Sequence, residues 1–291
     1  MQTIRLAATA GTLALLAGCA GMKPDAPTCP SDAAITAMTA RYVALQQQPA
    51  PPADLTIAGA QCGRDKFARS LTNDYGPVIG YKAGLTNEAV QKRFNYPAPM
   101  WGTLNQKMIL RNGASVPAQF GARPVFEADL VAVVKSPKIH DAKTPLEALS
   151  QISVLYPFIE LPDLQYEDPS KLNGPALQLI NVGARYGVLG QPILVQPTQA
   201  FLDSLRDMTV RLVGNDGRDL DSGKGAAILN QPVNAAIWLA GDLKKNGITL
   251  KEGDLLSLGS FTKLLQPKPG TTVWAVYDGL PGNPSVSVQF K

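Results

Sequence analysis

Apolar positions recur at helical spacing in only two long segments of the chain. Residues 31–48 and 230–247 place apolar side chains every three or four positions, the period of an amphipathic helix. Ser31 or Asp32 can cap the first helix, and Gly247 can end the second. Shorter helices are expected at residues 62–76, 87–97, 144–156 and 197–205.

From about residue 106 the pattern is typical of strands. Hairpin turns are expected at Asn112-Gly113 and within residues 207–225, and residues 98–104 are expected to be a loop. Further strands are expected at residues 77–86, 124–135, 157–165, 254–263, 271–279 and 285–290. This order of helices and strands along the chain fits neither a doubly wound α/β fold nor a simple β-sandwich. It predicts an α+β protein with a mostly β body and short helices on its outside.

The expected strand PVFEADLVAVVK, residues 124–135, carries two carboxylates. Side chains at i and i+2 point to the same face of a strand, so Glu127 and Asp129 lie side by side while Ala128 faces away. Like charges at that distance raise each other's pKa unless a cation intervenes. Taken alone, the pair fits either a solvated sheet face or half of a metal site.

Composition bounds the size and the partners of the protein. The 291 residues are 45% hydrophobic and 17% charged, which suffices for one large domain or two small ones. The net charge of +4 is small for this length, and no Lys/Arg cluster alternates with aromatic residues. A nucleic-acid partner is therefore not expected.

The beginning of the chain has the layout of an export signal. Arg5 precedes an apolar run, residues 6–17, that is too short to span a bilayer. The run ends in LAGC, which resembles the bacterial lipoprotein signal: Cys19 would carry lipid after removal of residues 1–18. Ala20 would then favour the periplasmic face of the outer membrane. An ordinary signal peptide cut nearby is the alternative.

The other cysteines agree with export. If Cys19 carries lipid, Cys29 and Cys62 remain as an even pair, and oxidising compartments favour a disulfide between them. Two free thiols are the alternative. Residues 19–30 are rich in Pro and small side chains, so we expect a tether there.

Further polar side chains stand where the pattern expects apolar packing. They are Lys82, Glu160, Asp163 and Ser260. Three carboxylates on two strands suit a hard divalent cation such as Mg²⁺, which takes oxygen ligands and keeps several waters. Zinc is disfavoured because it prefers Cys and His. The only histidine, His140, is expected in a loop, with a catalytic role as the alternative.

Several stretches between residues 31 and 291 match known sequence motifs, and they follow one another in the same order as those motifs do. They include GYKAGLTNEAVQKRF, FEADLVAVV, FIELPDLQ, NVGARYGVLG, LNQPVNAAIWLAGDLKKNG and LGSFTK. Together they resemble the fumarylacetoacetate hydrolase superfamily and, within it, the 2-keto-4-pentenoate hydratase branch. The resemblance implies a mixed sheet rolled into a barrel-like body with a small N-terminal part. It also implies Mg²⁺ or Mn²⁺ as cofactor and a small 2-keto acid as substrate.

The resemblance also implies roles for single residues. The family's metal-binding Glu-x-Glu falls on Glu127 and Asp129, the latter one methylene shorter, and its third carboxylate falls on Glu160. Lys82 and Asp163 match family positions expected to be catalytic. The positions expected to bind substrate are Leu85, Asn181, Ser260 and Thr262.

These observations predict a divalent-metal-dependent hydratase, a lyase that acts on a short 2-keto acid such as 2-keto-4-pentenoate through a metal-stabilised enolate. One alternative is a catalytically inactive binding or structural lipoprotein on the same fold. Met100 favours it, because a thioether stands where hydratases carry an acid in PDFG, and so does export, because ring-cleavage pathways are usually cytosolic. An acylpyruvate-type C–C hydrolase is the other alternative.

The expected organisation has four parts. They are a signal peptide over residues 1–18, a tether over 19–30, a small N-terminal part over 31–105 and a β-roll over 106–291. The expected membrane contact is the lipid anchor. The resemblance also implies that the chain can form a homo-oligomer.

Overall fold

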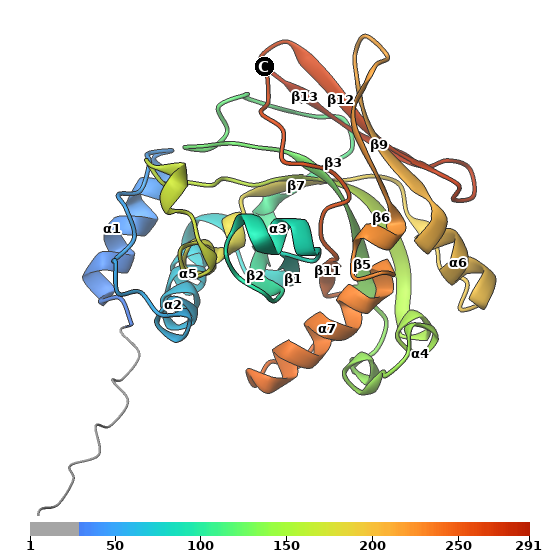
Figure 1. Ribbon diagram of the computed structural model, residues 1–291, viewed down its shortest axis with the longest axis horizontal. Helices are drawn as coiled ribbons and strands as arrows, with labels where there is room; N and C mark the ends of the chain where they lie inside the picture. Colours follow the sequence, from blue (N-terminus) through green and yellow to red (C-terminus); the bar gives the residue numbers. More distant parts are fainter. Residues whose placement is uncertain (1–28) are drawn as a thin grey trace, which may run out of the picture.

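The computed structural model describes residues 29–291 (Figure 1). The predicted signal peptide and the lipidation of Cys19 lie outside the described residues. Within residues 29–291, no helix combines the length and the apolarity that crossing a membrane requires.

The larger sheet curls around the middle of the molecule and is mixed. Its order is β2-β1-β11-β5-β6-β7-β3, with β8 beside β6. Strand β11 pairs with β1 in parallel and with β5 antiparallel. The strands are β1 (Val78–Gly84), β2 (Met100–Asn105), β3 (Ile109–Arg111), β5 (Glu127–Val134), β6 (Ile152–Leu161), β7 (Tyr186–Leu189), β8 (Ile193–Leu194) and β11 (Leu255–Ser257).

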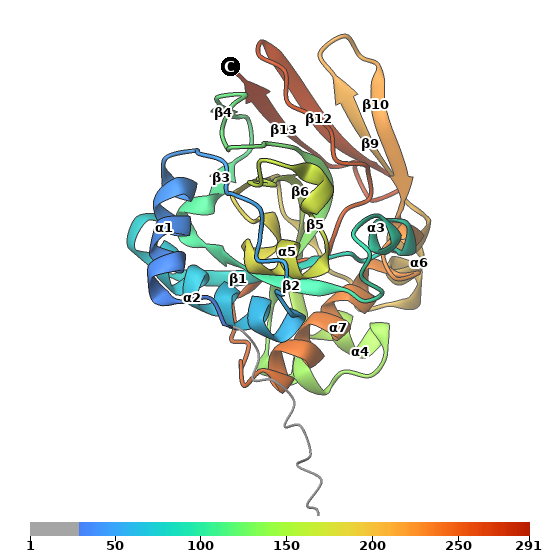
Figure 2. The ribbon, with the colours of Figure 1, turned by 60° about the vertical axis from the view of Figure 1, so that its left-hand side comes forward.

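The smaller sheet has the order β10-β9-β12-β13-β4 and stands at the top of the molecule in Figure 2. It contains β4 (Ala114–Val116), β9 (Thr209–Gly214), β10 (Asp219–Lys224), β12 (Thr271–Asp278) and β13 (Ser285–Phe290). The antiparallel pair β9–β10 is the hairpin predicted within residues 207–225.

Short helices surround the two sheets. They are α1 (Asp32–Val43), α2 (Ile57–Tyr75), α3 (Glu88–Arg93), α4 (Pro145–Ser150), α5 (Gly174–Leu179), α6 (Gln199–Asp207) and α7 (Pro232–Lys245). Short 3₁₀ turns cover Gln106–Met108, Pro137–Asp141, Pro169–Lys171, Asn181–Gly183 and Gly225–Ala227. Side-chain oxygens cap the first and third helices, because Ser31 accepts from the Ala34 N–H and Asn87 accepts from the Val90 N–H.

Two hydrophobic cores hold these layers together. The larger contains one face of β5, namely Ala128, Leu130, Ala132 and Val134, together with the buried side of α7 and the inner face of the smaller sheet. The smaller lies among α1, α2 and α5. The other face of β5 begins with Glu127 and Asp129. The predicted α+β class, with a rolled mixed sheet and short peripheral helices, is confirmed.

Three local predictions were wrong. Residues 100–105 form strand β2 rather than a loop, because β1 pairs with them antiparallel. Asn112-Gly113 joins no hairpin, since β3 pairs with β7 and β4 pairs with β13. The helix begun at Thr144 and Pro145 ends at Ser150, where the chain turns into β6.

The expected boundary after residue 105 does not separate two sheets. Strands β1 and β2 belong to the N-terminal part, yet β1 lies between β2 and β11 in the larger sheet. What distinguishes the N-terminal part is its helices, which pack in the smaller core.

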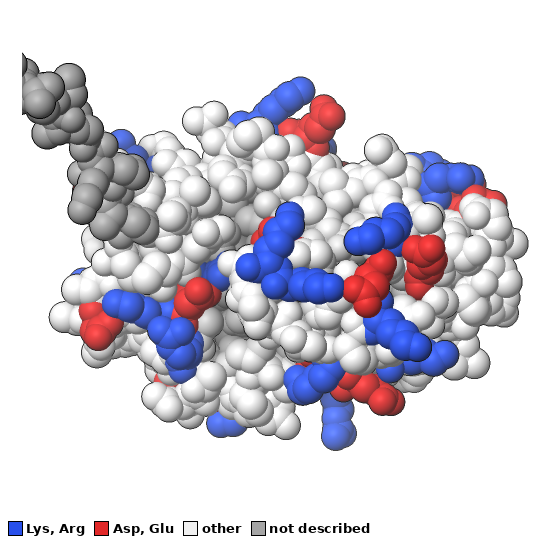
Figure 3. Space-filling view, turned by 90° about the horizontal axis from the view of Figure 1, so that it is seen from below, with Lys and Arg blue, Asp and Glu red and all other residues white. Residues whose placement is uncertain are grey.

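The surface seen from below in Figure 3 carries both signs of charge. Lys and Arg side chains alternate there with Asp and Glu, and uncharged surface covers most of this face. Neither positive nor negative charge predominates on this face.

Candidate active site

Two carboxylates face each other across the middle of the larger sheet. Glu127 on β5 pairs directly with Glu160 on β6, so both side chains lie on one face of the sheet. Lys82 reaches them from β1, where its ammonium is ion-paired with Glu160 Oε1. Glu160 and Lys82 are only 2% and 3% exposed. Burial of this depth makes each uncompensated charge costly.

The Lys82 ammonium is oriented by a strained segment of backbone. Its Nζ donates to the Val182 carbonyl oxygen at 2.9 Å. Val182 has φ 53°, a left-handed conformation that a β-branched residue rarely adopts. Its neighbour Asn181 fixes this turn on β2, because Asn181 Oδ1 accepts from the Thr103 N–H at 2.8 Å and Nδ2 donates to the Thr103 carbonyl at 3.0 Å. Strain held in this way is typical of functional sites.

The three charged groups lie in the wall of a cavity of about 600 Å³. Most of its lining is apolar, and Ala89, Val90 and Arg93 of helix α3 form part of it. Apolar residues of the lining include Leu85, Val90, Phe94, Leu177, Val182 and Phe261. A few convergent polar groups in an apolar cavity are the usual form of a small-molecule site.

Two loops that close the cavity contact each other through a glycine. Gly259 has φ +107°, and a Cβ built there would lie 2.2 Å from Thr86 Oγ1. A side chain at this position would therefore push the loop after β11 away from the turn after β1. The close approach brings Leu85 and Ser260 into one lining.

Hydroxyl groups beside Glu127 are held by the backbone. Ser260 Oγ donates to the Thr262 carbonyl at 2.7 Å. Thr262 Oγ1 accepts from the Ala128 N–H at 3.0 Å. Lys82, Leu85, Glu127, Glu160, Ser260 and Thr262 were all predicted as site residues, and the structure brings them together in one cavity.

Asp129 lies beneath the cavity rather than in its lining. Its carboxylate accepts from the N–H groups of Leu130, Leu258 and Gly259 and from the Ser257 hydroxyl. It is fully buried. Its oxygens are thus already occupied by donors of β5, β11 and the following loop, and this position does not support the ligand role predicted for it.

Burial and the charge of Glu160 raise the pKa of the two carboxyl groups on β5. Burial raises the pKa of Glu127 well above its usual range, the Glu160 charge raises it further, and Lys82 opposes both effects. Burial, followed by the Glu160 charge, raises the pKa of Asp129 to about 7, against hydrogen bonds that lower it. One ammonium therefore does not compensate the negative charge of this region.

The carboxylates that face the cavity fit a metal ion that needs few ligands from the protein. In residues 29–291 no group of three or more His, Cys, Asp or Glu side chains is arranged to hold a metal ion. Glu127 and Glu160 remain open to the cavity, and Glu160 Oε1 accepts no aligned hydrogen bond despite its contact with Lys82. Two carboxylates completed by waters and substrate oxygens are typical of Mg²⁺.

The structure does not bring Asp163 or Asn181 into the lining. The Asp163 carboxylate accepts from the Ala122, Arg123 and Gln165 N–H groups and lies 3.6 Å from Arg185 Nη1. It holds a loop in place, so a catalytic role is not supported by its position. Asn181, predicted to bind substrate, instead positions Val182 and through it Lys82.

Other residues that the sequence analysis singled out lie outside the cavity and take part in packing, hydrogen bonding or a disulfide. His140 lies in the 3₁₀ turn Pro137–Asp141, where Nδ1 contacts the Ala240 carbonyl and Nε2 accepts from the Leu250 N–H, both at 2.8 Å. Met100 is buried in the smaller core. The predicted disulfide between Cys29 and Cys62 is present.

Sequence reasoning missed the outer part of the cavity. Arg93, Asp221 and Lys263 line it but were not predicted as site residues. Arg93 lies eleven positions after Lys82 in the same resembling stretch, so that stretch could have indicated it. The hairpin that supplies Asp221 carries no such signal.

Comparison with known proteins finds relatives in sequence and in fold. No family model matches the chain. A 2-keto-4-pentenoate hydratase from Burkholderia vietnamiensis is 27% identical over 246 residues, which is 82% of this chain and 88% of that protein. The solved 4-oxalocrotonate decarboxylase from Pseudomonas putida G7, complexed with magnesium and adipate, superposes with a TM-score of 0.78 at 22% identity, covering 89% of this chain and 97% of its own.

A more distant structure extends the fold comparison. A yeast fumarylacetoacetate hydrolase family protein has a TM-score of 0.51 at 15% identity and covers 72% of this chain and 91% of its own. The fold is thus that of fumarylacetoacetate hydrolase-type proteins. Sequence relatives of the chain at about 25% identity are named 2-keto-4-pentenoate hydratase and 4-oxalocrotonate decarboxylase.

Proposed function

We propose that the protein is a divalent-metal-dependent enzyme that acts on a small 2-keto acid, of the hydratase or decarboxylase type. The observation that carries this proposal is the pair Glu127 and Glu160, opposed across β5 and β6 in an apolar cavity with Lys82 beside them. The named relatives, a hydratase and a decarboxylase, support the same reaction types.

Glu127 and Glu160 would hold the metal, Mg²⁺ or Mn²⁺, from one face of the sheet. When bound, the metal would supply Lewis-acid stabilisation for the negative charge that develops on a 2-oxo oxygen. The apolar lining excludes water and so strengthens each electrostatic contact at the reacting end. Ser260 and Thr262, with their hydroxyls beside Glu127, would contact the substrate carboxylate.

Lys82 is the group placed to hold or move a proton. Its Nζ is fixed between the Val182 carbonyl and Glu160, at the floor of the cavity. A proton carrier with one fixed orientation transfers to one substrate carbon rather than to several. We propose hydration of 2-keto-4-pentenoate as the reaction, with decarboxylation of a 4-oxalocrotonate-type substrate as the second candidate.

Turnover with defined substrates tests this proposal. The chain without its predicted signal peptide, residues 20–291, is assayed with Mg²⁺ or with EDTA by loss of the absorbance of 2-hydroxypenta-2,4-dienoate and of 4-oxalocrotonate. We expect Mg²⁺-dependent loss with wild type, and a decrease of at least about 100-fold in kcat for Lys82→Met because general acid–base catalysis contributes about that much. Lys245→Met, the same change at an exposed lysine away from the cavity, is the matched control, and Glu252→Gln serves this purpose for the carboxylate variants.

Absence of turnover with both substrates in metal-loaded protein would contradict the proposal that the protein is an enzyme and would favour the inactive binding protein.

Localisation is a separate proposal: Cys19 carries lipid and anchors the protein to the periplasmic face of the outer membrane. Metabolic labelling with a fatty acid, lost in Cys19→Ser, tests it.

A further inference from the structure

The outer end of the cavity has one cation without a carboxylate partner. Arg93 is the last residue of α3, is exposed, and lines the cavity. Its guanidinium lies 5.5 Å from the centre of the Phe94 ring. Within residues 29–291, no Asp or Glu oxygen lies within 4.0 Å of Arg93.

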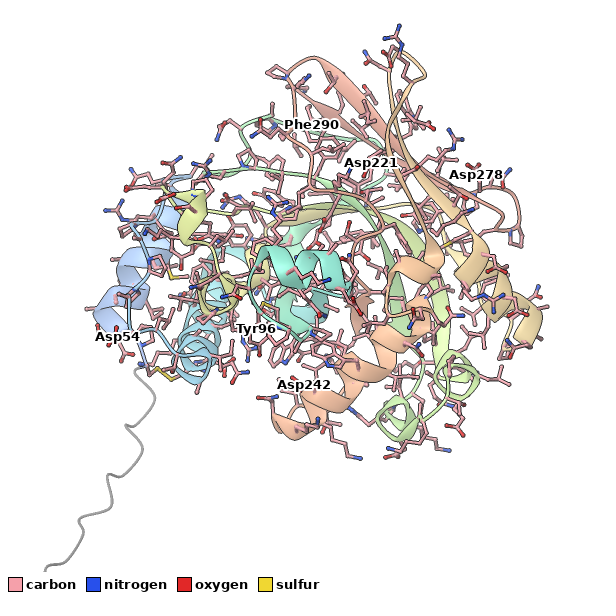
Figure 4. The ribbon with its side chains drawn as sticks, viewed as in Figure 1. Asp54, Tyr96, Asp221, Asp242, Asp278 and Phe290 are labelled. Atoms are coloured by element: carbon pink, nitrogen blue, oxygen red, sulfur yellow. A yellow bond between two sulfur atoms is a disulfide. The ribbon has the colours of Figure 1, made fainter. Side chains whose placement is uncertain are left out.

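The second cation at this end is already compensated. Asp221 on β10 accepts from the Lys263 N–H at 2.7 Å, and the Lys263 ammonium lies 3.9 Å from the same carboxylate. Figure 4 shows Asp221 near the smaller sheet, above α3. The net charge of the outer end therefore comes from Arg93.

A neighbouring hollow extends this positive region. Its volume is about 770 Å³, and it shares Arg93, Leu164 and Leu264 with the cavity. Arg123 also lines it, and no Asp or Glu does. An anion approaching from this side meets a positive field.

Apolar side chains make up most of the lining, among them Leu85, Val90, Phe94, Phe261 and Leu264. Lys82 and Glu160 are 3% and 2% exposed, whereas Arg93 is exposed, so the polar floor lies deep and Arg93 lies toward solvent. A fitting ligand thus has a polar head, an apolar middle and an anionic tail.

We propose that the cavity selects 2-oxo dicarboxylic acids, with Arg93 contacting the distal carboxylate. This inference rests on the proposed function, because the 2-oxo acid head would bind at Glu127 and Glu160. A guanidinium presents parallel N–H donors that match a carboxylate, which an ammonium does not. Arg93 is then a specificity-determining residue, and a monocarboxylic acid of equal length leaves it unused. Of the two substrates proposed above, the inference therefore favours the 4-oxalocrotonate type over 2-keto-4-pentenoate.

Two inert probes of equal chain length test the inference. Dissociation constants for 2-oxohexanedioate and 2-oxohexanoate are measured by calorimetry with saturating Mg²⁺. We expect wild type to bind the dicarboxylate about tenfold more tightly, the worth of one charge-assisted contact. Arg93→Gln should remove this preference while its affinity for 2-oxohexanoate stays unchanged.

Lys92→Gln is the matched control. It removes the same charge one position earlier on α3, where Lys92 lines a different hollow. It should keep the preference. In wild type the preference should fall as NaCl is raised to about 0.5 M, because exposed charge pairs are screened.

The outcomes separate this inference from the proposed function. If wild type binds both probes equally, or if Arg93→Gln keeps the preference, dicarboxylate selection is wrong while the 2-oxo acid site stands. If neither probe binds in the presence of Mg²⁺, the proposed function fails and the inference falls with it.

Discussion

At the scale of single residues, Asp129 shows how one carboxylate can serve a site without facing it. It collects three backbone N–H groups and a hydroxyl from elements far apart in the chain, and so fixes the loop that carries Ser260. Because Asp129 stands two positions after Glu127, the sequence predicted that both side chains lie on the same face of the strand. The sequence does not specify that donors near residue 258 already occupy the carboxylate, because that depends on the pairing of β11 with β5.

Removing the Asp129 oxygens should destabilise the protein even without metal. Asp129→Ala leaves the Leu130 and Gly259 N–H groups without this acceptor, while the Leu258 N–H keeps the Leu130 carbonyl at 3.0 Å. We therefore expect the free energy of unfolding in urea to fall by about 2 kcal/mol or more. Asp129→Asn keeps one oxygen for the N–H groups and lets the Ser257 hydroxyl reverse, so it should lose less than about 1 kcal/mol. Equal stability of Asp129→Ala and wild type in EDTA would contradict this account.

The raised carboxyl pKa values give the stability of the metal-free protein a definite pH dependence. The pKa of Asp129 is 3.8 ordinarily and about 7 in the fold, and that of Glu127 is raised as well. Between pH 3.8 and about pH 7, the folded state binds the Asp129 proton more tightly than the unfolded state does. The free energy of unfolding therefore decreases as the pH rises through this range.

We therefore expect the thermal midpoint in EDTA to fall from pH 5 to pH 8. Glu127→Gln should flatten this slope, because it removes one titrating carboxyl and one repulsive charge. Added Mg²⁺ should raise the midpoint more at pH 8 than at pH 5, since Glu127, whose pKa is raised, must lose its proton to bind it. A midpoint in EDTA that rises over this range would show that the carboxylates are not mutually destabilising.

At the scale of elements, the smaller sheet supports the backbone beneath the site. Tyr277 on β12 is fully buried, and its hydroxyl contacts the carbonyls of Asp129 and Phe158 while accepting from the Phe158 N–H at 3.0 Å. It thus joins β12 to β5 and β6 where these strands pair. The strands themselves could be predicted from alternation. Their partners could not, as Asn112-Gly113 shows, because local turn residues do not reveal that β3 and β4 join different sheets.

Tyr277→Phe should weaken this connection. The change leaves the Phe158 N–H without its hydroxyl acceptor, so we expect the free energy of unfolding to fall by about 1–3 kcal/mol in urea. Tyr166→Phe is the comparison, because the Tyr166 hydroxyl makes only one long contact, 3.4 Å to the Ala176 carbonyl. A loss no larger than that of Tyr166→Phe would argue against a supporting role for Tyr277.

At the scale of the whole molecule, the disulfide joins the start of the described chain to α2. Cys29 and Cys62 are 33 positions apart, and the helix between them packs in the smaller core. Counting cysteines was enough to predict this link. The size of the N-terminal part was not predictable in the same way, because its strands complete a sheet made mostly of later residues.

Replacing both cysteines by serine should lower the free energy of unfolding by about 2–4 kcal/mol, the usual effect of releasing a loop of this length. The urea midpoint of wild type in dithiothreitol should move to that of the double variant. A midpoint unaffected by dithiothreitol in denaturant would mean that the link is unnecessary for stability.

The central claim is that Glu127 and Glu160 hold a divalent cation, and calorimetric titration of Mg²⁺ tests it most directly. We expect one binding site per chain in wild type and in Glu252→Gln, and no measurable heat of binding in Glu127→Gln or Glu160→Gln, provided that both variants keep the fold by circular dichroism. Equal Mg²⁺ affinity in wild type and in these two variants would contradict the account.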